Sequence, residues 1–269
     1  MSDEESFAPI QYILHTDRFR LLIFVERKSG VAFEEFERSW NEVSGELDLP
    51  GLHSLGIARY EKMIVDQDKK AELQSMGATV LNYDGIILIE AGSLEGFREY
   101  ITKRFVPEEA ETRILELENS RYAICHVAPI ITTKPASREN GGMRLIVHLK
   151  RKTGTTSQEF SKHWMKKHAG VVADFPGARD VIRLYDQNHV IKELSLGELT
   201  VNKSTTIGME KEWDGVPFLD AESLENLFVL LGEENFARVR QADEARFLDM
   251  KGSACAPVRV VTKLELGNR

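Results

Sequence analysis

The sequence predicts an α+β fold in which one β-α-β-β-α-β unit occurs twice and the two sheets pack together as an intramolecular barrel. Three observations predict it: an internal repeat, the same order of strand-like and helix-like segments in both halves, and an ordinary globular composition. At 269 residues, with 42% hydrophobic residues, the chain is long enough to bury one or two such cores.

The internal repeat consists of short motifs that recur in the same order in the two halves of the chain. The matched pairs are Arg20-Leu21 with Arg144-Leu145, Glu35-Phe36 with Glu159-Phe160, Trp40 with Trp164, Pro50-Gly51 with Pro176-Gly177, Tyr60 with Tyr185, and Asp84-Gly85 with Asp214-Gly215. A spacing of about 125 residues is too long for a solenoid unit and fits one small domain. We therefore expect a first repeat at 19–131, a linker at 132–142 and a second repeat at 143–266, which together make a pseudo-dimer.

Apolar runs and helical spacing predict the elements of the first repeat. Five consecutive apolar residues, 21–25, predict a buried strand, and Gly30 follows it as a breaker. Phe33, Phe36 and Trp40 recur at helical intervals and predict the next helix. The expected elements are strands over 19–27, 52–65, 83–90 and 121–131 and helices over 32–47, 69–76, 94–105 and 107–118.

The second repeat shows the same order after a linker of polar residues and glycine. The expected elements are strands over 143–151, 178–192, 215–220 and 258–266 and helices over 157–173, 223–231 and 235–250. The polar stretch 193–213 lacks a clear period, and we expect a loop or flap over the site there. Each repeat is thus a split βαβ, or ferredoxin-like, unit with helices on one face of its sheet. Two tandem units hide their uncovered apolar faces by packing sheet to sheet.

Charge and missing motifs argue against several classes of function. The net charge of −8 argues against a nucleic-acid partner. Apolar runs are too short for a membrane span and the N-terminus is acidic, so we expect a cytoplasmic protein without a membrane partner. The sequence has neither a glycine-rich phosphate loop nor a metal-binding motif. His163 and His168, five residues apart, are expected on different helix faces, so neither a metal nor a cofactor is predicted.

The polar positions of the second repeat resemble the EthD-type signature. The matching segments are Arg151-Lys152-Thr153-Gly154, Lys167-His168-Ala169, Pro176-Gly177, Tyr185-Asp186-Gln187-Asn188-His189 and Trp213-Asp214-Gly215. EthD-like proteins belong to the dimeric α+β barrel superfamily, so the resemblance implies that fold. It implies chemistry or binding inside a barrel without choosing a reaction, because the superfamily includes cofactor-free cyclases, decarboxylases, dehydratases and monooxygenases as well as haem proteins. The first repeat has Ser44 in place of the family histidine, which indicates a degenerate site.

Histidines of the second repeat are the candidates for acid–base chemistry near neutral pH. His168 is expected at the end of a helix near the barrel mouth, either as an acid or base or as an inert histidine at a helix C-terminus. His148 is expected to point into the barrel, because the residues that alternate with it are aliphatic. Its counterpart in the first repeat is Phe24, which predicts a barrel with one polar half. A core histidine bonded to the backbone is the alternative for His148.

The strand over 178–192 supplies the remaining candidates. Alternation places Arg183, Tyr185, Gln187 and His189 on one face, which we expect to line the barrel lumen or a lateral opening, and Tyr185 would polarise a substrate carbonyl. The predicted catalytic residues are His168, Tyr185, His148 and His189, and the predicted substrate-binding residues are Arg183, Gln187, Phe24, Tyr60 and Trp164. Arg151 and Lys152 either hold a carboxylate at the barrel end or are simply solvated, and Asp214 is interpreted as part of a turn.

These observations favour a cofactor-independent enzyme of dehydratase, decarboxylase or cyclase type. Its substrate would be a hydrophobic, oxygenated small molecule from polyketide or aromatic natural-product metabolism. One alternative is a protein that binds such a molecule without turnover, and another is a haem protein with His189 or His168 as axial ligand. The sequence leaves open whether the pseudo-dimer associates further into a homodimer.

Overall fold

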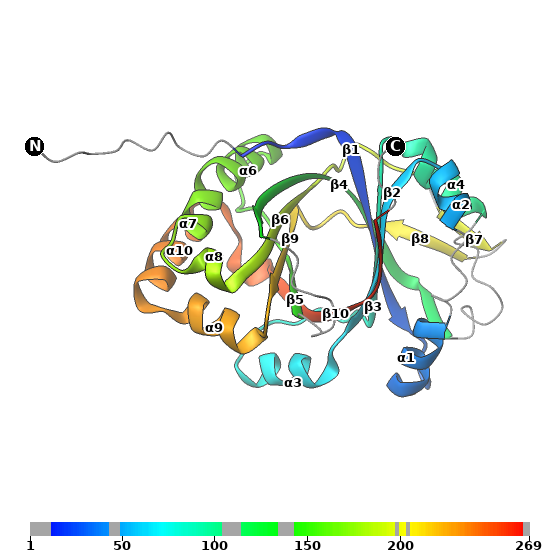
Figure 1. Cartoon of the computed structure of the whole chain (residues 1–269), viewed down its shortest axis with the longest axis horizontal. Coiled ribbons are helices and arrows are strands. Elements are labelled where there is room, and N and C mark those ends of the chain that lie inside the picture. Colours follow the sequence, from blue (N-terminus) through cyan, green and yellow to red (C-terminus); the bar gives the residue numbers. More distant parts are fainter. Residues whose placement is uncertain are drawn as a thin grey trace, which may run out of the picture.

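The strands of the structure, a computed structural model, form a closed barrel with helices on its outside (Figure 1). The structure describes residues 12–42, 49–103, 114–133, 143–196, 199–202 and 205–265. The strands are β1 (His15–Arg27), β2 (Ile57–Val65), β3 (Gly85–Ala91), β4 (Leu115–Thr132), β5 (Met143–His148), β6 (Ile182–Val190), β7 (Leu199–Asn202), β8 (Thr205–Met209), β9 (Gly215–Ala221) and β10 (Ala254–Glu265). The helices are α1 (Phe33–Glu42), α2 (Leu49–Ser54), α3 (Gln67–Ser75), α4 (Leu94–Lys103), α6 (Ser157–His163), α7 (Ala169–Ala173), α8 (Ala178–Val181), α9 (Leu224–Gly232) and α10 (Glu234–Phe247), with a π-helical turn η3 (Trp164–His168) and a 3₁₀ turn η4 (Met250–Gly252).

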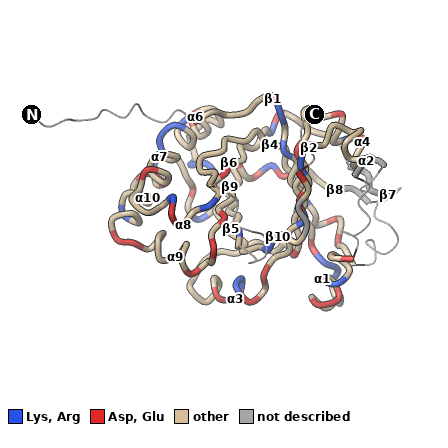
Figure 2. Tube along the Cα trace, in the orientation of Figure 1, with Lys and Arg blue, Asp and Glu red and all other residues tan. Residues whose placement is uncertain are grey.

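The barrel is closed by antiparallel pairing of neighbouring strands all the way round. The neighbours follow the order β1-β3-β2-β10-β5-β9-β6-β4, and β4 pairs with β1 to close the circle. The predicted α+β class with a closed barrel is therefore confirmed. None of the helices in the described part of the chain is long and apolar enough to cross a membrane. Acidic segments lie along α1, α3 and α10 on the outside (Figure 2).

The two halves of the barrel have the same strand order. The neighbours run β4-β1-β3-β2 before residue 133 and β10-β5-β9-β6 after residue 142, so each half places its first strand between its last and its third. The pairs β2–β10 and β4–β6 join the halves, with Val65 opposite Val258 and His126 opposite His189. Each half therefore supplies the hydrogen-bonding partner for both edges of the other, which leaves the barrel itself without an open edge.

An apolar cluster fills the middle of the barrel, and all of the barrel strands contribute to it. Its buried members are Leu22, Phe24, Met63, Val65, Leu81, Ile86, Leu88, Ala123, Cys125, Ile146, Val216, Phe218, Ala256 and Val258, with Leu184 and Val190 of β6 packed against them. Separate clusters lie between the outer face of the sheet and the helices, around Phe36 and Trp40 in the first half and around Ala169 and Phe236 in the second. The apolar cluster to which a residue belongs therefore shows whether its side chain points into the barrel or toward the helices.

The repeated tryptophan builds the same contact in both halves. The ring of Trp40 lies on Gly85, and the ring of Trp164 lies on Gly215. A Cβ atom at these glycines would meet the rings at 2.9 Å and 2.4 Å, respectively, which is closer than real contacts allow. Glycine is thus required at both strand starts because an aromatic ring occupies the side-chain position.

The repeated aspartate also builds one contact twice. Asp84 and Asp214 each accept a backbone N–H at 3.0 Å, from Arg27 and Arg151 respectively. The same arginine side chains pair with these carboxylates, at 3.3 Å in the first half and 2.5 Å in the second. Asp214 therefore ties the start of β9 to the end of β5 and is more than a turn residue.

Several predicted elements differ from the structure. Residues 115–118, expected in a helix, belong to β4, and the strand starts expected at 52 and 178 are the helices α2 and α8. The stretch expected as a loop or flap, 193–213, contains the hairpin β7–β8, and β8 pairs in parallel with β4. It forms because Leu196 and Ile207 are buried in the helix-side core of the first half, where Figure 1 shows the hairpin beside α4 and α2. Most of the predicted linker lies outside the described residues.

Candidate functional site

Strand β6 presents Tyr185, Gln187 and His189 to the helices of the second half. The residues between them, Asp186 and Asn188, face the barrel interior instead. The prediction that Arg183, Tyr185, Gln187 and His189 line the lumen is therefore wrong. Both faces of this strand carry polar groups because the interior contains buried arginines, so alternation alone could not decide which face points inward.

Tyr185 lies at the centre of the buried polar group on the helix side. Its hydroxyl oxygen accepts hydrogen bonds from Trp164 Nε1 at 3.2 Å and from Gln187 Nε2 at 2.9 Å. Gln187 is held in place because its Nε2 also donates to the Trp164 carbonyl oxygen at 3.0 Å. Burial raises the pKa of Tyr185. The hydroxyl is therefore protonated, and with both lone pairs engaged it has only its proton left to offer a ligand.

His189 continues this polar group toward helix α6. Its Nδ1 lies 2.8 Å from Ser161 Oγ and its Nε2 lies 3.3 Å from Gln187 Oε1, while its ring is 4.6 Å from the Trp164 ring. Burial lowers the pKa of His189 to about 3, helped by the nearby His126. His189 is thus neutral at physiological pH. The tautomer with Nε2–H donating to Gln187 lets Nδ1 accept from the Ser161 hydroxyl, which satisfies both nitrogens.

His168 and His163 both bind the carboxylate of Asp243 on helix α10. His168 Nδ1 lies 3.0 Å from Asp243 Oδ2, and His163 Nε2 lies 2.9 Å from Asp243 Oδ1. The expectation that a spacing of five places them on different helix faces is wrong, because the turn between them is π-helical and returns to the same face after about five residues. His168 is also buried, 6% exposed, and not at a helix end, since α7 continues the helix to Ala173.

Asp243 orients the His168 ring for acid–base chemistry. Although burial opposes the charge, hydrogen bonds from His168 and His163 hold the pKa of Asp243 below its usual range. A charged Asp243 keeps the proton of His168 on Nδ1 and leaves Nε2 as the basic nitrogen. Asp243 is a residue that the sequence reasoning missed. Its signal in the sequence is weak, because Asp243 is one of three acidic residues in the helix over 234–247 and only the structure shows that it is buried.

Helix α10 contacts both the His168 side and the Tyr185 side of this buried polar group. Asp243 binds His168, and its neighbour Glu244 lies close enough to Tyr185 to raise the pKa of that hydroxyl. Hydrogen bonds join Tyr185, Gln187, His189 and Trp164 into one group between β6 and η3. His168 lies on the same turn η3 as Trp164 and bonds to α10 through Asp243. We call this group, together with His168, the helix-side site. It contains three of the four predicted catalytic residues and two of the five predicted substrate-binding residues.

His148 lies apart from the helix-side site, in the barrel interior. It is 0% exposed, and its ring is 4.7 Å from that of Phe24 and 3.3 Å from that of Trp213. Alternation along its strand thus predicts its direction correctly. Neither ring nitrogen has a hydrogen-bond partner among the described residues, so the alternative of a backbone-bonded core histidine does not hold there. Burial holds the pKa of His148 well below its usual value.

The other predicted substrate-binding residues are scattered. Tyr60 lies in the helix-side core of the first half, with its ring 6.2 Å from that of Tyr100. Arg183 pairs with Glu222 at 3.0 Å near the surface. Phe24 touches His148 and not the helix-side site. These residues therefore do not form one site with Tyr185.

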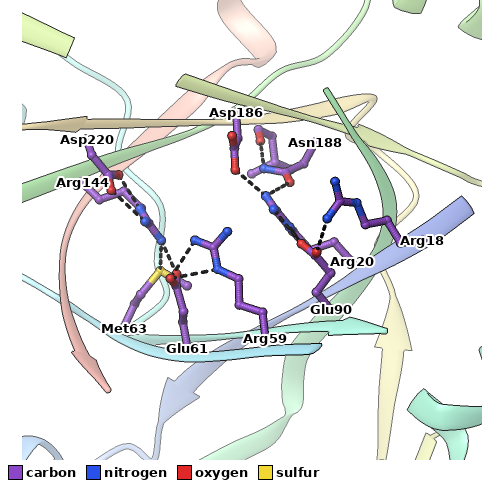
Figure 3. Close-up of polar contacts among 11 residues, drawn as sticks. Arg18, Arg20, Arg59, Glu61, Met63, Glu90, Arg144, Asp186, Asn188 and Asp220 are labelled. Atoms are coloured by element: carbon purple, nitrogen blue, oxygen red, sulfur yellow. Dashed lines mark hydrogen bonds and ion pairs between the residues drawn. The ribbon is translucent and has the colours of Figure 1, made fainter. Parts of the chain in front are cut away.

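The barrel interior also contains two ion-pair networks centred on the repeated arginines (Figure 3). Arg20 bonds to Glu90, Asp186 and Asn188, and Arg144 bonds to Glu61 and Asp220, with the closest contacts of the two networks at 2.8 Å and 2.6 Å. Opposing its burial, Arg144 and Arg59 lower the pKa of Glu61, so this carboxylate is charged. The recurrence of Arg-Leu at the start of both repeats was the signal for these networks. Their satisfied hydrogen bonds fit a role in holding the barrel together.

A metal ion or a haem on the helix side would need donor side chains there. Among the described residues, no group of three or more histidine, cysteine, aspartate or glutamate side chains is arranged to hold a metal ion. Both nitrogens of His189 are engaged with Ser161 and Gln187, so its use as a haem ligand would break two hydrogen bonds. His189 therefore does not fit the role of an axial ligand.

Comparison with solved structures supports the fold. An anthrone oxidase-like protein matches with a TM-score of 0.57 at 9% identity, over 96% of this chain and 97% of that chain. A candidate monooxygenase from Lactobacillus acidophilus matches with a TM-score of 0.54 at 12% identity, over 93% and 97%. A mutant chlorite dismutase from Candidatus Nitrospira defluvii in complex with cyanide matches with a TM-score of 0.50 at 11% identity, over 91% and 90%. At such identities the likeness shows the fold alone.

Comparison with families identifies the segment that contains the helix-side site. No curated protein matches the chain. Residues 152–251 match the model of the EthD domain, and this segment includes His168, Tyr185 and Asp243. The predicted EthD resemblance is confirmed: residues 152–251 match the EthD domain model, and the barrel that carries them is similar in fold to these solved structures.

Proposed function

We propose that the protein is a cofactor-independent enzyme that performs acid–base chemistry on a hydrophobic, oxygenated small molecule, with the helix-side site as its active site. The observation that carries the proposal is the Tyr185 hydroxyl, which accepts two N–H donors and keeps its own proton for a ligand. Donors at the oxygen polarise the O–H bond, so Tyr185 is suited to protonate a carbonyl oxygen. Two proteins of similar fold, an anthrone oxidase-like protein and a candidate monooxygenase, agree with small-molecule chemistry on this scaffold.

His168 supplies the base in this proposal. Its Nε2 removes a proton from the carbon next to a substrate carbonyl, while Asp243 stabilises the imidazolium that forms. At the same time the Tyr185 hydroxyl donates its proton to the carbonyl oxygen, and the substrate becomes an enol. The proton thus moves from carbon to His168, and no electrons leave the substrate.

The same pair completes a dehydration without a further group. The enol expels a hydroxyl group from the next carbon, which takes the proton held by His168 and leaves as water. The enol oxygen returns its proton to Tyr185 as the carbonyl re-forms. Decarboxylation and aldol-type cyclisation pass through the same enol, so the site favours this group of reactions. Metabolism of polyketides or other aromatic natural products would supply such substrates.

We also propose that the chain is a tandem of two ferredoxin-like units, 19–131 and 143–266, of which the second holds the active site. The identical strand order in both halves and the repeated Trp–Gly and Asp–Arg contacts support it. In the first unit Tyr60 keeps the position of Tyr185, but Ile64 stands at or near the position of His189. Loss of polar groups in one copy is expected when the other copy carries the chemistry.

Exchange of a carbon-bound proton tests the enzyme proposal before the substrate is known. The protein is incubated with 1-tetralone in D₂O, and loss of the signal of the hydrogens next to the carbonyl is followed by NMR. The wild type should exchange them faster than buffer, and His168→Asn and Tyr185→Phe should each reduce the rate by about 100-fold or more. A wild-type rate equal to that of buffer, with binding retained, would favour the binding protein without turnover.

A further inference from the structure

One end of the barrel carries a basic pocket that the proposed chemistry does not use. The pocket has a volume of about 430 Å³ and is lined by the loop Thr153-Gly154-Thr155 after β5. Its cationic side chains are Lys150, Arg151, Lys152, Lys192 and Lys211. Two carboxylates, Glu212 and Asp214, also line it. A pocket with five cations and two anions is unusual on a chain of net charge −8 and favours an anionic ligand.

The ion pairs in the pocket leave part of this charge uncompensated. Arg151 and Lys192 both bind Asp214, at 2.5 Å and 2.9 Å, and Lys150 lies 3.9 Å from Glu212. Lys152 donates to the carbonyl oxygen of Ala245, which carries no charge to balance it. Lys211 is exposed and has no ion pair within the described part of the chain. Lys152 and Lys211 are therefore the cations available to a carboxylate.

Trp213 connects this pocket to the unpaired histidine inside the barrel. The residues on either side of it, Glu212 and Asp214, line the pocket, while its ring lies 3.3 Å from His148 and 5.4 Å from Phe24. Tyr83 adds a third aromatic ring, 6.3 Å from that of His148. A polar group buried without a partner is costly, and apolar aromatic walls around it match the ring of an aromatic ligand. His148 can either donate or accept a hydrogen bond from such a ligand.

We propose that this end of the barrel is a second ligand site, separate from the helix-side site, which binds a small aromatic carboxylate. The carboxylate lies on Lys152 and Lys211. The ring takes a place among Phe24, Tyr83 and Trp213, and an oxygen substituent of the ring hydrogen-bonds to His148. Trp213 must turn away from His148 to admit the ring, so binding changes the surroundings of its indole.

Fluorescence of Trp213 tests the proposal with a matched pair of probes. The chain has three tryptophans, of which Trp40 and Trp164 are buried between the sheet and the helices, so a change in the barrel reports on Trp213. We expect saturable quenching by 4-hydroxybenzoate and at least about tenfold weaker binding of 4-hydroxybenzamide, which lacks the charge. The signal should disappear in Trp213→Phe. Equal affinity for the two probes, or an unchanged signal in Trp213→Phe, would overturn the proposal.

Three variants separate the two ends of the proposed ligand. Calorimetry with 4-hydroxybenzoate should show about tenfold weaker binding for Lys211→Gln and for His148→Phe, since each removes one hydrogen-bonding or charged partner. Lys162→Gln, an exposed charge change on α6, should bind as the wild type does. Unfolding curves show whether each variant is folded at the assay temperature. Affinity unchanged in both Lys211→Gln and folded His148→Phe would contradict the site.

Discussion

Two buried neutral histidines should make the protein lose stability in mild acid. His148 and His189 are 0% and 5% exposed, and burial lowers the pKa of both, that of His189 to about 3. A histidine with a lowered pKa binds its proton only after unfolding. Its contribution to the free energy of unfolding is therefore fully present above the unfolded pKa of about 6.5 and is lost as the pH falls below that value.

The size of the effect follows from linkage. With an unfolded pKa of about 6.5 and a folded pKa of about 3, His189 alone removes about 2 kcal/mol of stability between pH 7 and pH 5. His148 acts in the same direction. The stability lost through both histidines is a large share of the free energy of unfolding of a typical domain, roughly 5–15 kcal/mol. Urea unfolding followed by circular dichroism at pH 7, 6 and 5 measures it.

His148→Phe provides the matched variant, because phenylalanine occupies the equivalent position, Phe24, in the first half. The variant removes one titrating group and two unpaired nitrogens, so its stability should fall less steeply between pH 7 and pH 5 than that of the wild type. Any loss of stability caused by the larger phenylalanine ring is already present at pH 7, so it cancels when the change between pH 7 and pH 5 is compared. A slope equal to that of the wild type would mean that His148 titrates normally, and the assignment of a buried, unpaired imidazole would be refuted.

Further predictions concern the orientation of His168, the interior ion pairs and the Trp–Gly contact. Asp243→Asn should keep the fold but lower the rate of proton exchange, because the imidazolium that forms on His168 loses its carboxylate partner; an unchanged rate would remove Asp243 from the mechanism. Arg144→Met should cost about 3–5 kcal/mol in denaturant unfolding, since it leaves Glu61 charged and buried without its main partner; a loss below about 1 kcal/mol would contradict this. Gly215→Ala should destabilise by about 1–3 kcal/mol through its clash with Trp164, and a neutral result would show that the ring can move aside.

The barrel could be predicted from the sequence because its evidence is repeated. Leu21 to Val25 and their counterparts signal buried strands, and the paired Trp and Asp-Gly motifs fix equivalent contacts in each half. The hairpin β7–β8 could not be predicted in the same way. It has no counterpart in the described part of the first half, lies in a mostly polar segment, and depends on a few apolar residues such as Leu196 and Ile207 reaching the core of the other half.

The direction of β6 and the geometry of His168 could not be predicted for physical reasons. Strand β6 carries polar residues on both faces, and Asp186 is drawn inward by Arg20, which lies far away in the sequence. The π-helical turn η3 left only an indirect signal: the second repeat is longer between Trp164 and Pro176 than the first is between Trp40 and Pro50. Extra residues within a helix are a source of such turns. Residue types were thus easier to identify than the face on which they act.

The exchange of the carbon-bound hydrogens of 1-tetralone in Tyr185→Phe and Tyr60→Phe tests the central claim most directly. The two tyrosines occupy equivalent positions in the two repeats, but only Tyr185 lies beside Trp164 and Gln187. Catalysis on the helix side of the second half predicts that Tyr185→Phe loses the exchange and Tyr60→Phe retains the wild-type rate. Full exchange in Tyr185→Phe, or equal loss in both variants, would contradict it.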